Sequence, residues 1–176
     1  MKDKTSLKSI IVLVSICLVI AIAMAAVNLV TAPKIEEYNI QKQNEALADV
    51  LSENGGFEAL DLAGMPETVT GAWRDMDGEG YAFMLSAKGY DASNPIVIAV
   101  GMTNDGKIIK CRTVSATGET AGIGSKVAES EFTDTFGDKD SSLAGVDTIS
   151  GATISSRAYI GAVKDAFAAL EMVKED

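Results

Sequence analysis

The chain has 176 residues, which is enough for one ordinary domain plus an anchor, and 47% of them are hydrophobic. Its formal net charge of −10 argues against binding to nucleic acid or to anionic lipid headgroups. The sequence contains no histidine, which removes Ser-His and Cys-His nucleophile pairs and most zinc sites, so hydrolytic functions lose most of their support.

An apolar run occupies residues 10–30, with Ser15 and Asn28 as its only clearly polar members. Because a helix rises 1.5 Å per residue, a run of this length crosses a hydrocarbon core of about 30 Å. The run therefore predicts a transmembrane helix. A cleaved signal peptide is the alternative, since Ala23 and Ala25 are small enough for a cleavage site, but the run is longer than a usual signal core.

The charges that flank the run predict its orientation. Lys2, Lys4 and Lys8 precede it, against Asp3 as the single acidic residue. The positive-inside tendency places residues 1–9 in the cytoplasm and the rest of the chain outside it. We therefore expect a single-pass protein of the cell (inner) membrane with an acidic extracytoplasmic domain.

Residues 31–56 are expected to form a helical stalk or linker between the anchor and that domain. A partial apolar stripe predicts an amphipathic helix from about residue 34 to residue 53, and Gly55-Gly56 would end it. The domain itself is expected over residues 57–176. Its first part, residues 57–80, is punctuated by glycines and predicts no clear element.

Three apolar segments, residues 81–87, 96–102 and 108–114, predict strands. The turn Asn104-Asp-Gly-Lys is a tight hairpin signal between the last two. A short helix and an acidic loop over residues 134–142 should follow. A final helix is predicted by apolar residues spaced three or four apart, namely Ile160, Val163, Phe167, Leu170 and Val173. The predicted fold is α+β, a small mainly antiparallel sheet packed with helices and preceded by one N-terminal transmembrane helix.

The segment from Asp147 to Ser156 reads DTISGATISS and crowds hydroxyl groups at the start of the last helix. Capping of the helix explains such a composition by itself, and composition alone favours that interpretation. The same helix start also favours a phosphate, because its free N–H groups lie at the positive end of the helix dipole. Gly151 and Ala152 would let a bulky ligand approach the backbone closely.

This segment resembles the flavinylation motif of FMN-binding domains, D-x-x-[ST]-G-A-[TS]-x-[TS]. That family includes the G subunit of the Rnf electron transport complex and the related C subunit of the Na⁺-translocating NADH:quinone reductase. The resemblance implies that Thr153 holds FMN covalently, through a phosphoester bond to its phosphate. It also implies that Asp147 guides a flavin transferase. The other implied cofactor-binding positions of this motif are Ser150, Gly151, Ala152 and Ser155.

Another glycine-bearing loop, Glu119 to Lys126, lies earlier in the chain and is called the first glycine loop below. It is similar to the segment E-T-P-G-L-G-x-K of the Rnf G subunit. Its glycines would bring backbone N–H groups against the flavin or its phosphate. Ala121 in place of proline, and Gly118 where many relatives carry histidine, suggest a looser loop. The family's G-Y-G-G segment is matched only in part, by residues 89–92. The cofactor-binding positions implied by this loop are Glu119, Thr120, Gly122, Ile123, Gly124 and Lys126.

The resemblance implies an electron-transfer flavoprotein subunit that relays electrons in an Rnf-type, ion-translocating ferredoxin:NAD⁺ oxidoreductase complex. Such a chain would be a redox subunit of a translocase rather than a stand-alone enzyme. Its partners would be other integral membrane and redox subunits, and a flavin transferase would mature it. Two alternatives stay open: a free-standing membrane-anchored FMN protein for extracellular electron transfer, and a non-redox assembly or binding module.

Other candidate residues favour structural roles. The spacing of Asp134, Asp138 and Asp140 fits no EF-hand loop, so we expect a solvated acidic loop there and no metal site. Cys111 lies in a predicted strand and is expected to be a small buried residue. Arg157 follows the motif directly, and either a nearby phosphate or an acidic partner would explain it.

Overall fold

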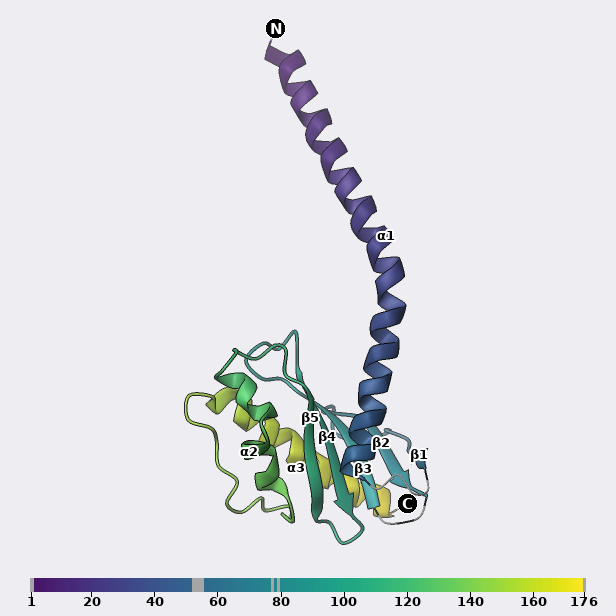
Figure 1. Cartoon of the computed structure of the whole chain (residues 1–176), viewed down its shortest axis with the longest axis vertical. Coiled ribbons are helices and arrows are strands. Elements are labelled where there is room, and N and C mark those ends of the chain that lie inside the picture. The colour runs from purple at the N-terminus through teal and green to yellow at the C-terminus, as the bar shows by residue number, and fades with distance from the viewer. Residues whose placement is uncertain (1, 52–55, 77, 79, 176) are drawn as a thin grey trace. The chain divides into compact units, whose positions relative to one another are not determined.

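The computed structural model describes residues 2–51, 56–76, 78 and 80–175. The chain divides into two compact units, Met1–Gln41 and Lys42–Asp176. The first unit consists of most of helix α1 (Lys2–Val50), and the last turns of that helix belong to the second unit. Figure 1 labels the elements of both units.

Helix α1 continues without interruption through Pro33, so the expected transmembrane helix and the expected stalk helix are parts of one helix. A proline inside a helix removes one backbone hydrogen bond, and in α1 that loss does not end the helix. The hydroxyl of Thr31 donates to the carbonyl oxygen of Val27 at 3.0 Å, so this polar group is satisfied within the helix itself. By length and composition, the helix from Lys8 onward is long and apolar enough to cross a membrane, with a mean hydropathy of 3.2 in its most apolar window.

The second unit is built on a five-stranded antiparallel sheet in which each strand pairs with the next along the chain (Figure 1). This arrangement confirms the predicted α+β fold. The strands are β1 (Phe57–Ala59), β2 (Val69–Asp75), β3 (Gly80–Ala87), β4 (Ile96–Thr103) and β5 (Ile108–Ser115). The last three match the predicted segments to within one residue at each end.

Strands β1 and β2 lie in the region where no element was predicted. Gly71 interrupts the apolar pattern of β2, and the register to β3 shifts between Val69 and Gly71. A Cβ on Gly71 would come within 2.2 Å of the Trp73 ring, so the glycine makes room for the indole two residues later. Here glycine serves packing inside a strand, and not the turn that its presence suggested.

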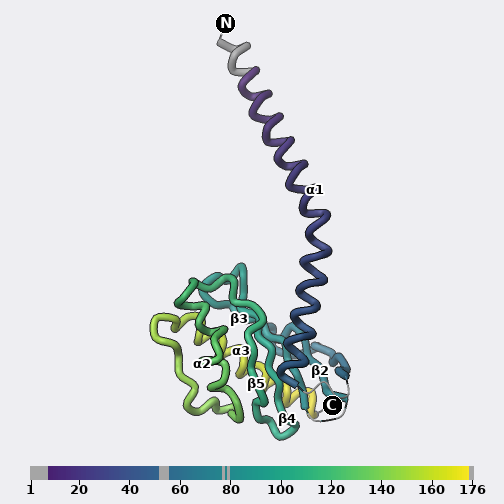
Figure 2. The backbone as a smooth tube through the Cα atoms, in the orientation of Figure 1, coloured from purple at the N-terminus to yellow at the C-terminus, as the bar shows by residue number. Residues whose placement is uncertain are grey.

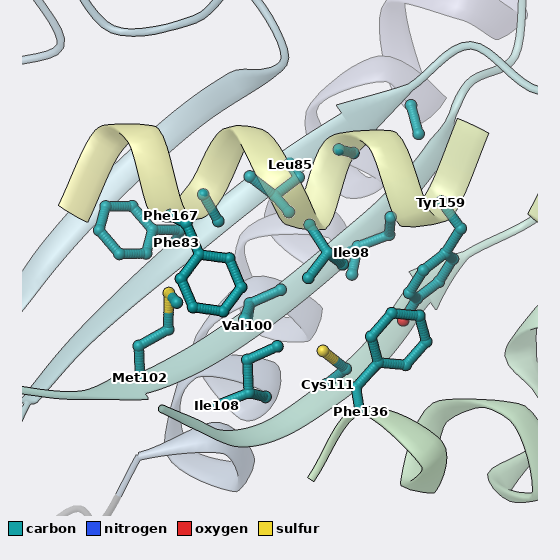
Figure 3. Packing of buried hydrophobic residues seen from close by; sticks show 14 of the residues in the cluster. Phe83, Leu85, Ile98, Val100, Met102, Ile108, Cys111, Phe136, Tyr159 and Phe167 are labelled. Atoms are coloured by element: carbon teal, nitrogen blue, oxygen red, sulfur yellow. The ribbon is translucent and has the colours of Figure 1, made fainter. Parts of the chain in front are cut away.

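Helix α3 (Thr153–Glu175) covers one face of the sheet. Figure 3 shows Phe83, Leu85 and Ile98 pointing from the strands toward this helix, and these residues belong to one buried cluster. The apolar stripe predicted for the last helix is confirmed, since Val163, Phe167 and Leu170 are buried in this cluster and Ile160 and Val173 pack against it.

The opposite face of the sheet is covered by the end of α1. Ala46, Leu47 and Val50 pack with Leu51 against small and apolar residues of β3 and β4, namely Ala82, Met84 and Ala99. The carboxylate of Asp49 forms one ion pair with Lys110 at 2.8 Å and another with Arg112 at 3.3 Å. The predicted stalk therefore contributes its last turns to the core of the domain. The helix ends at Val50, and the predicted stop at Gly55 lies outside the described residues.

Between β5 and α3 the chain forms three short helical segments beside the sheet (Figure 2). They are η1 (Gly124–Ala128), α2 (Ser130–Thr133) and η2 (Asp134–Phe136). Phe132 and Phe136 pack against the ring of Tyr159 on α3, with ring centroids 5.2 and 5.3 Å apart. This aromatic contact joins the segment between the two glycine-bearing loops to α3.

Candidate functional site

The loop that leads into α3 is held by a buried serine. The hydroxyl of Ser156 accepts the N–H of Ile149 at 3.1 Å and donates to the carbonyl oxygen of Ala152 at 2.8 Å. Gly151 lies between them with φ of +81°, a backbone conformation that glycine adopts without steric cost. The hydrogen bonds of Ser156 therefore fix the conformation of this loop, and the hydroxyl of Thr153 takes no part in them.

Thr153 is the first residue of α3, and its side chain is exposed. Its hydroxyl makes no hydrogen bond to any residue that the structure describes. The backbone N–H groups of Thr153, Ile154 and Ser155 likewise find no acceptor among the described residues. Three free donors at the positive end of a long helix form a favourable place for an anionic group such as a phosphate.

These groups open onto a pocket of about 390 Å³. Both glycine-bearing loops and the segment around Tyr90 line it. Tyr90, Ile123 and Ile154 are 69%, 49% and 59% exposed, which is unusual for large apolar side chains. The lining residues are Tyr90, Thr120, Ile123, Gly124, Gly151, Ala152, Thr153, Ile154 and Ser155. Apolar walls beside a few polar groups suit a flat aromatic ligand that carries a phosphate, so the residues present fit FMN.

The loop from Thr120 to Lys126 contributes side chains more than backbone donors. The N–H of Gly122 donates to the Ser125 hydroxyl at 2.9 Å, and those of Ile123 and Ser125 both donate to the carbonyl oxygen of Thr120 at 3.1 Å. These three amides are satisfied inside the loop, whereas the N–H of Gly124 has no acceptor among the described residues. The pocket instead meets Thr120, the Ile123 side chain and the bare surface of Gly124.

Glu119 lies behind this lining and is 7% exposed. One carboxylate oxygen, Oε1, accepts the N–H of Tyr90 at 2.9 Å, and the other, Oε2, accepts the hydroxyl of Ser155. A Cβ on Gly124 would come within 2.7 Å of Oε2, so the glycine is needed for this close approach. One carboxylate thus connects the Tyr90 segment, the first glycine loop and the start of α3.

The structure brings seven of the twelve predicted site residues into the pocket: Gly151, Ala152, Thr153, Ser155, Thr120, Ile123 and Gly124. Lys126 and Asp147 line a neighbouring pocket of about 400 Å³, together with Thr148 and Ile149. Ser150 and Gly122 line neither of these two pockets. The loop from Asp147 to Ser155 therefore contributes to both pockets.

Two lining residues were not among the predicted ones. Tyr90 belongs to the segment that matched the family's G-Y-G-G only in part, and this partial match was the available signal. Ile154 had no signal beyond its place in the first turn of the last helix. Sequence alone could not assign these two side chains to the pocket, because an exposed apolar residue is identified as part of a pocket only when its neighbours in the fold are known.

The remaining candidate residues, Asp140, Cys111 and Arg157, do not line this pocket. Asp140 accepts the N–H and the hydroxyl of Ser142 at 2.9 and 2.6 Å, and these hydrogen bonds lower the pKa of its carboxyl group. Cys111 is buried, as predicted, and burial raises the pKa of its thiol well above the ordinary value. The guanidinium of Arg157 is exposed and forms no ion pair with any of the described residues.

Comparison with known proteins agrees with this site. Residues 89–168 match the FMN-binding domain, and the match includes Tyr90, both loops and most of α3. The chain is 28% identical to the G subunit of the proton-translocating ferredoxin:NAD(+) oxidoreductase complex of Clostridium ljungdahlii, with 94% of this chain and 92% of the relative covered. It is also 28% identical to the G subunit of the ion-translocating oxidoreductase complex of Methanosarcina acetivorans, with 94% and 95% covered. The resemblance to FMN-binding domains and to the G subunits of such complexes is confirmed.

Proposed function

We propose that this chain is the FMN-carrying, membrane-anchored electron-transfer subunit of an ion-translocating ferredoxin:NAD⁺ oxidoreductase complex. The FMN would be bound covalently to Thr153. The observation that carries the proposal is the exposed hydroxyl of Thr153, without a hydrogen-bond partner among the described residues, beside three free N–H groups at the start of α3. The FMN-binding domain match over the same residues and the names of the two relatives support it.

The residues of the pocket would divide the work of holding the cofactor. The N–H groups at the start of α3 would bind the phosphate, and Thr153 would supply the oxygen of the phosphoester bond. The modified protein would equal the chain plus FMN less one water, with the Thr153 oxygen bound to the phosphorus. Tyr90, Ile123 and Ile154 would offer apolar surface to the flavin ring, and the small Gly124 and Gly151 would leave space for it.

FMN supplies one- and two-electron redox chemistry, and the protein sets its position and its potential. Attachment through the phosphate leaves the redox-active ring free of covalent constraint. It also prevents loss of the cofactor outside the cytoplasm, where no pool replaces it. The chain would then act as an electron relay between partner subunits of an oxidoreductase complex, the kind of assembly after which its relatives are named.

The N-terminal helix would hold this relay at the membrane. Lys2, Lys4 and Lys8 would keep the N-terminus in the cytoplasm, and the acidic domain would lie outside it. A flavin transferase would then have to act on that side. Asp147 is exposed beside the neighbouring pocket, which makes it accessible to such an enzyme.

The test is the intact mass of the protein extracted from membranes of a host with an active flavin transferase. The wild type should be heavier than its sequence by one FMN less one water, and Thr153→Ala should have the unmodified mass. Thr148→Ala, which removes another exposed hydroxyl of the same loop, is the matched control and should still be modified. An unmodified wild type would refute the covalent flavin and leave the binding-module alternative standing.

A further inference from the structure

The carboxylate of Glu119 is held from two sides by close packing. A Cβ on Gly89 would lie 1.9 Å from its Oε1, and a Cβ on Gly124 would lie 2.7 Å from its Oε2. No side chain larger than hydrogen fits at either position unless the carboxylate moves. Its two oxygens are therefore confined between the Tyr90 segment and the first glycine loop, where they accept the hydrogen bonds of Tyr90 and Ser155.

Both carboxyl oxygens of Glu119 act as hydrogen-bond acceptors, one from the N–H group of Tyr90 and one from the hydroxyl of Ser155. None of the ion pairs formed among the described residues includes Glu119. A negative charge held here without a cationic partner would be weakly screened, so its field would extend into the adjoining pocket.

That field would act on whatever occupies the pocket. Gly124 and Ser155, the residues that touch the carboxylate, are themselves part of the pocket lining. Reduction adds electrons to a flavin, and a fixed negative charge nearby makes this addition less favourable. Charges beside the ring are among the means by which a protein sets flavin electronics.

We propose that Glu119 is the positioning residue of the flavin site, and that its negative charge lowers the reduction potential of the FMN held there. The proposal rests on the proposed function for the cofactor. It assigns two separable effects to one side chain: a hydrogen-bonded junction between three segments, and an electrostatic influence on the pocket.

Three variants separate these effects. Glu119→Gln removes the charge but keeps the shape, because an amide oxygen accepts from the Tyr90 N–H and an amide nitrogen donates to the Ser155 hydroxyl. Glu119→Ala removes both charge and junction. Glu171→Gln is the control, because Glu171 is exposed on α3, the helix that carries Ser155. The 16 residues between them, at 1.5 Å each, place Glu171 about 24 Å along the helix axis from Ser155. That separation exceeds the Debye length of roughly 8–10 Å.

The electrostatic effect is measured by potentiometric titration of the flavin absorbance in the purified full-length proteins. In the Glu119→Gln molecules that carry FMN, the reduced-to-oxidised ratio at a fixed potential should shift at least tenfold toward the reduced form. For a two-electron couple a tenfold shift corresponds to about 30 mV. Glu171→Gln should titrate like the wild type. A flavin in Glu119→Gln with the wild-type potential would overturn the electrostatic part of the proposal.

The positioning effect is measured without the cofactor, by hydrogen exchange in the Thr153→Ala background. Glu119→Ala should accelerate exchange at residues 88–91 and 150–156, and Glu119→Gln should restore slow exchange. The informative amides are those of Tyr90, Ala152 and Ser156, which are hydrogen-bonded in the structure. Equal exchange at these amides in both variants and in the background protein would overturn the positioning role. A wild type without FMN would refute the proposed function instead, while the exchange comparison would still decide whether Glu119 joins the three segments.

Discussion

A Cβ placed on Gly101 of β4 would lie 2.0 Å from the carbonyl oxygen of Val50, the last residue of α1. The end of the helix therefore rests directly on the backbone of the sheet, and only glycine permits this approach. The contact lies on the face opposite to α3, so the sheet is enclosed by helices on both faces. The stability of the domain should therefore depend on the packing of both helices against the sheet.

Gly101→Ala should destabilise the domain by about 1–3 kcal/mol, because the added methyl group forces the helix end away from the sheet. Chemical denaturation of the detergent-solubilised protein, followed by the fluorescence of Trp73, measures this. Trp73 packs at the edge of the same cluster and is the single tryptophan of the chain. Gly161→Ala is the control: its Cβ would meet nothing within 4 Å, and alanine should stabilise this helical position by roughly 0.5–1 kcal/mol. Equal effects of the two substitutions would contradict the contact.

The carboxyl group of Asp49 should make the stability of this contact pH-dependent. A hydrogen bond from Lys110, with the charges of Lys110 and Arg112, holds the pKa of Asp49 below its ordinary value of 3.8. A depressed folded-state pKa contributes stability above the unfolded-state pKa, and this contribution is lost as the pH falls through the folded-state pKa. Asp49→Asn should therefore lower the free energy of unfolding at pH 7.

The expected loss is at most about 1 kcal/mol, because the pair is partly exposed and water screens it. The difference from wild type should shrink as denaturation is repeated at pH values below 3.8. Asp105→Asn, an exposed change in the turn between β4 and β5, should be neutral across the same range. A difference for Asp49→Asn that does not depend on pH would argue against the ion pair as its source.

Cys111 should resist alkylation in the folded protein. Its side chain is buried, and burial raises the pKa of the thiol, so the reactive thiolate is scarce. In a Cys17→Ser background, labelling by N-ethylmaleimide should be at least tenfold slower in native protein than in denaturant, as followed by mass. Ser93→Cys in the exposed segment before β4 supplies an accessible thiol for comparison. Equally fast labelling of both thiols would show that the core opens.

Gly151→Ala should impair the cofactor site without unfolding the domain. The backbone of Gly151 has φ of +81°, and an L side chain in this region costs about 1–2 kcal/mol. The loop should shift, and the fraction of protein that carries FMN should fall in the intact-mass measurement. Asparagine tolerates this conformation better, so Gly151→Asn should retain more FMN than Gly151→Ala. The reverse order would indicate that the loss of space outweighs the backbone strain.

The parts of the fold that followed from sequence are those with local periodic patterns. Strands β3 to β5, the hairpin turn after β4 and the stripe of α3 each repeat their signal over several residues. Strand β1 has three residues and is defined by pairing, with Glu58 opposite Arg74 and bonded to it at 2.7 Å. Such a strand has no pattern of its own, so its partner must be known first. The packing of the end of α1 on the sheet is equally non-local.

The candidate site divides in the same way. The two loops around Gly124 and Thr153 were found from their motifs, which are contiguous in sequence. Tyr90 reaches the pocket because its N–H is held by Glu119, 29 residues further along the chain. Likewise, nothing local reveals that Glu119 turns away from the pocket and meets Ser155 instead. Both features arise from contacts between segments that only the folded chain brings together.

Ser156 and Glu119 satisfy the polar groups that shape the site with donors and acceptors of the protein itself. The hydrogen bonds of these two residues are complete among the described residues, and the N–H groups at the start of α3 are left for a ligand. If FMN is attached as proposed, the domain would therefore fold first and receive its prosthetic group later. Under the same proposal, the apoprotein would cross the membrane, reach its final shape and stay a competent substrate until a flavin transferase acts on it.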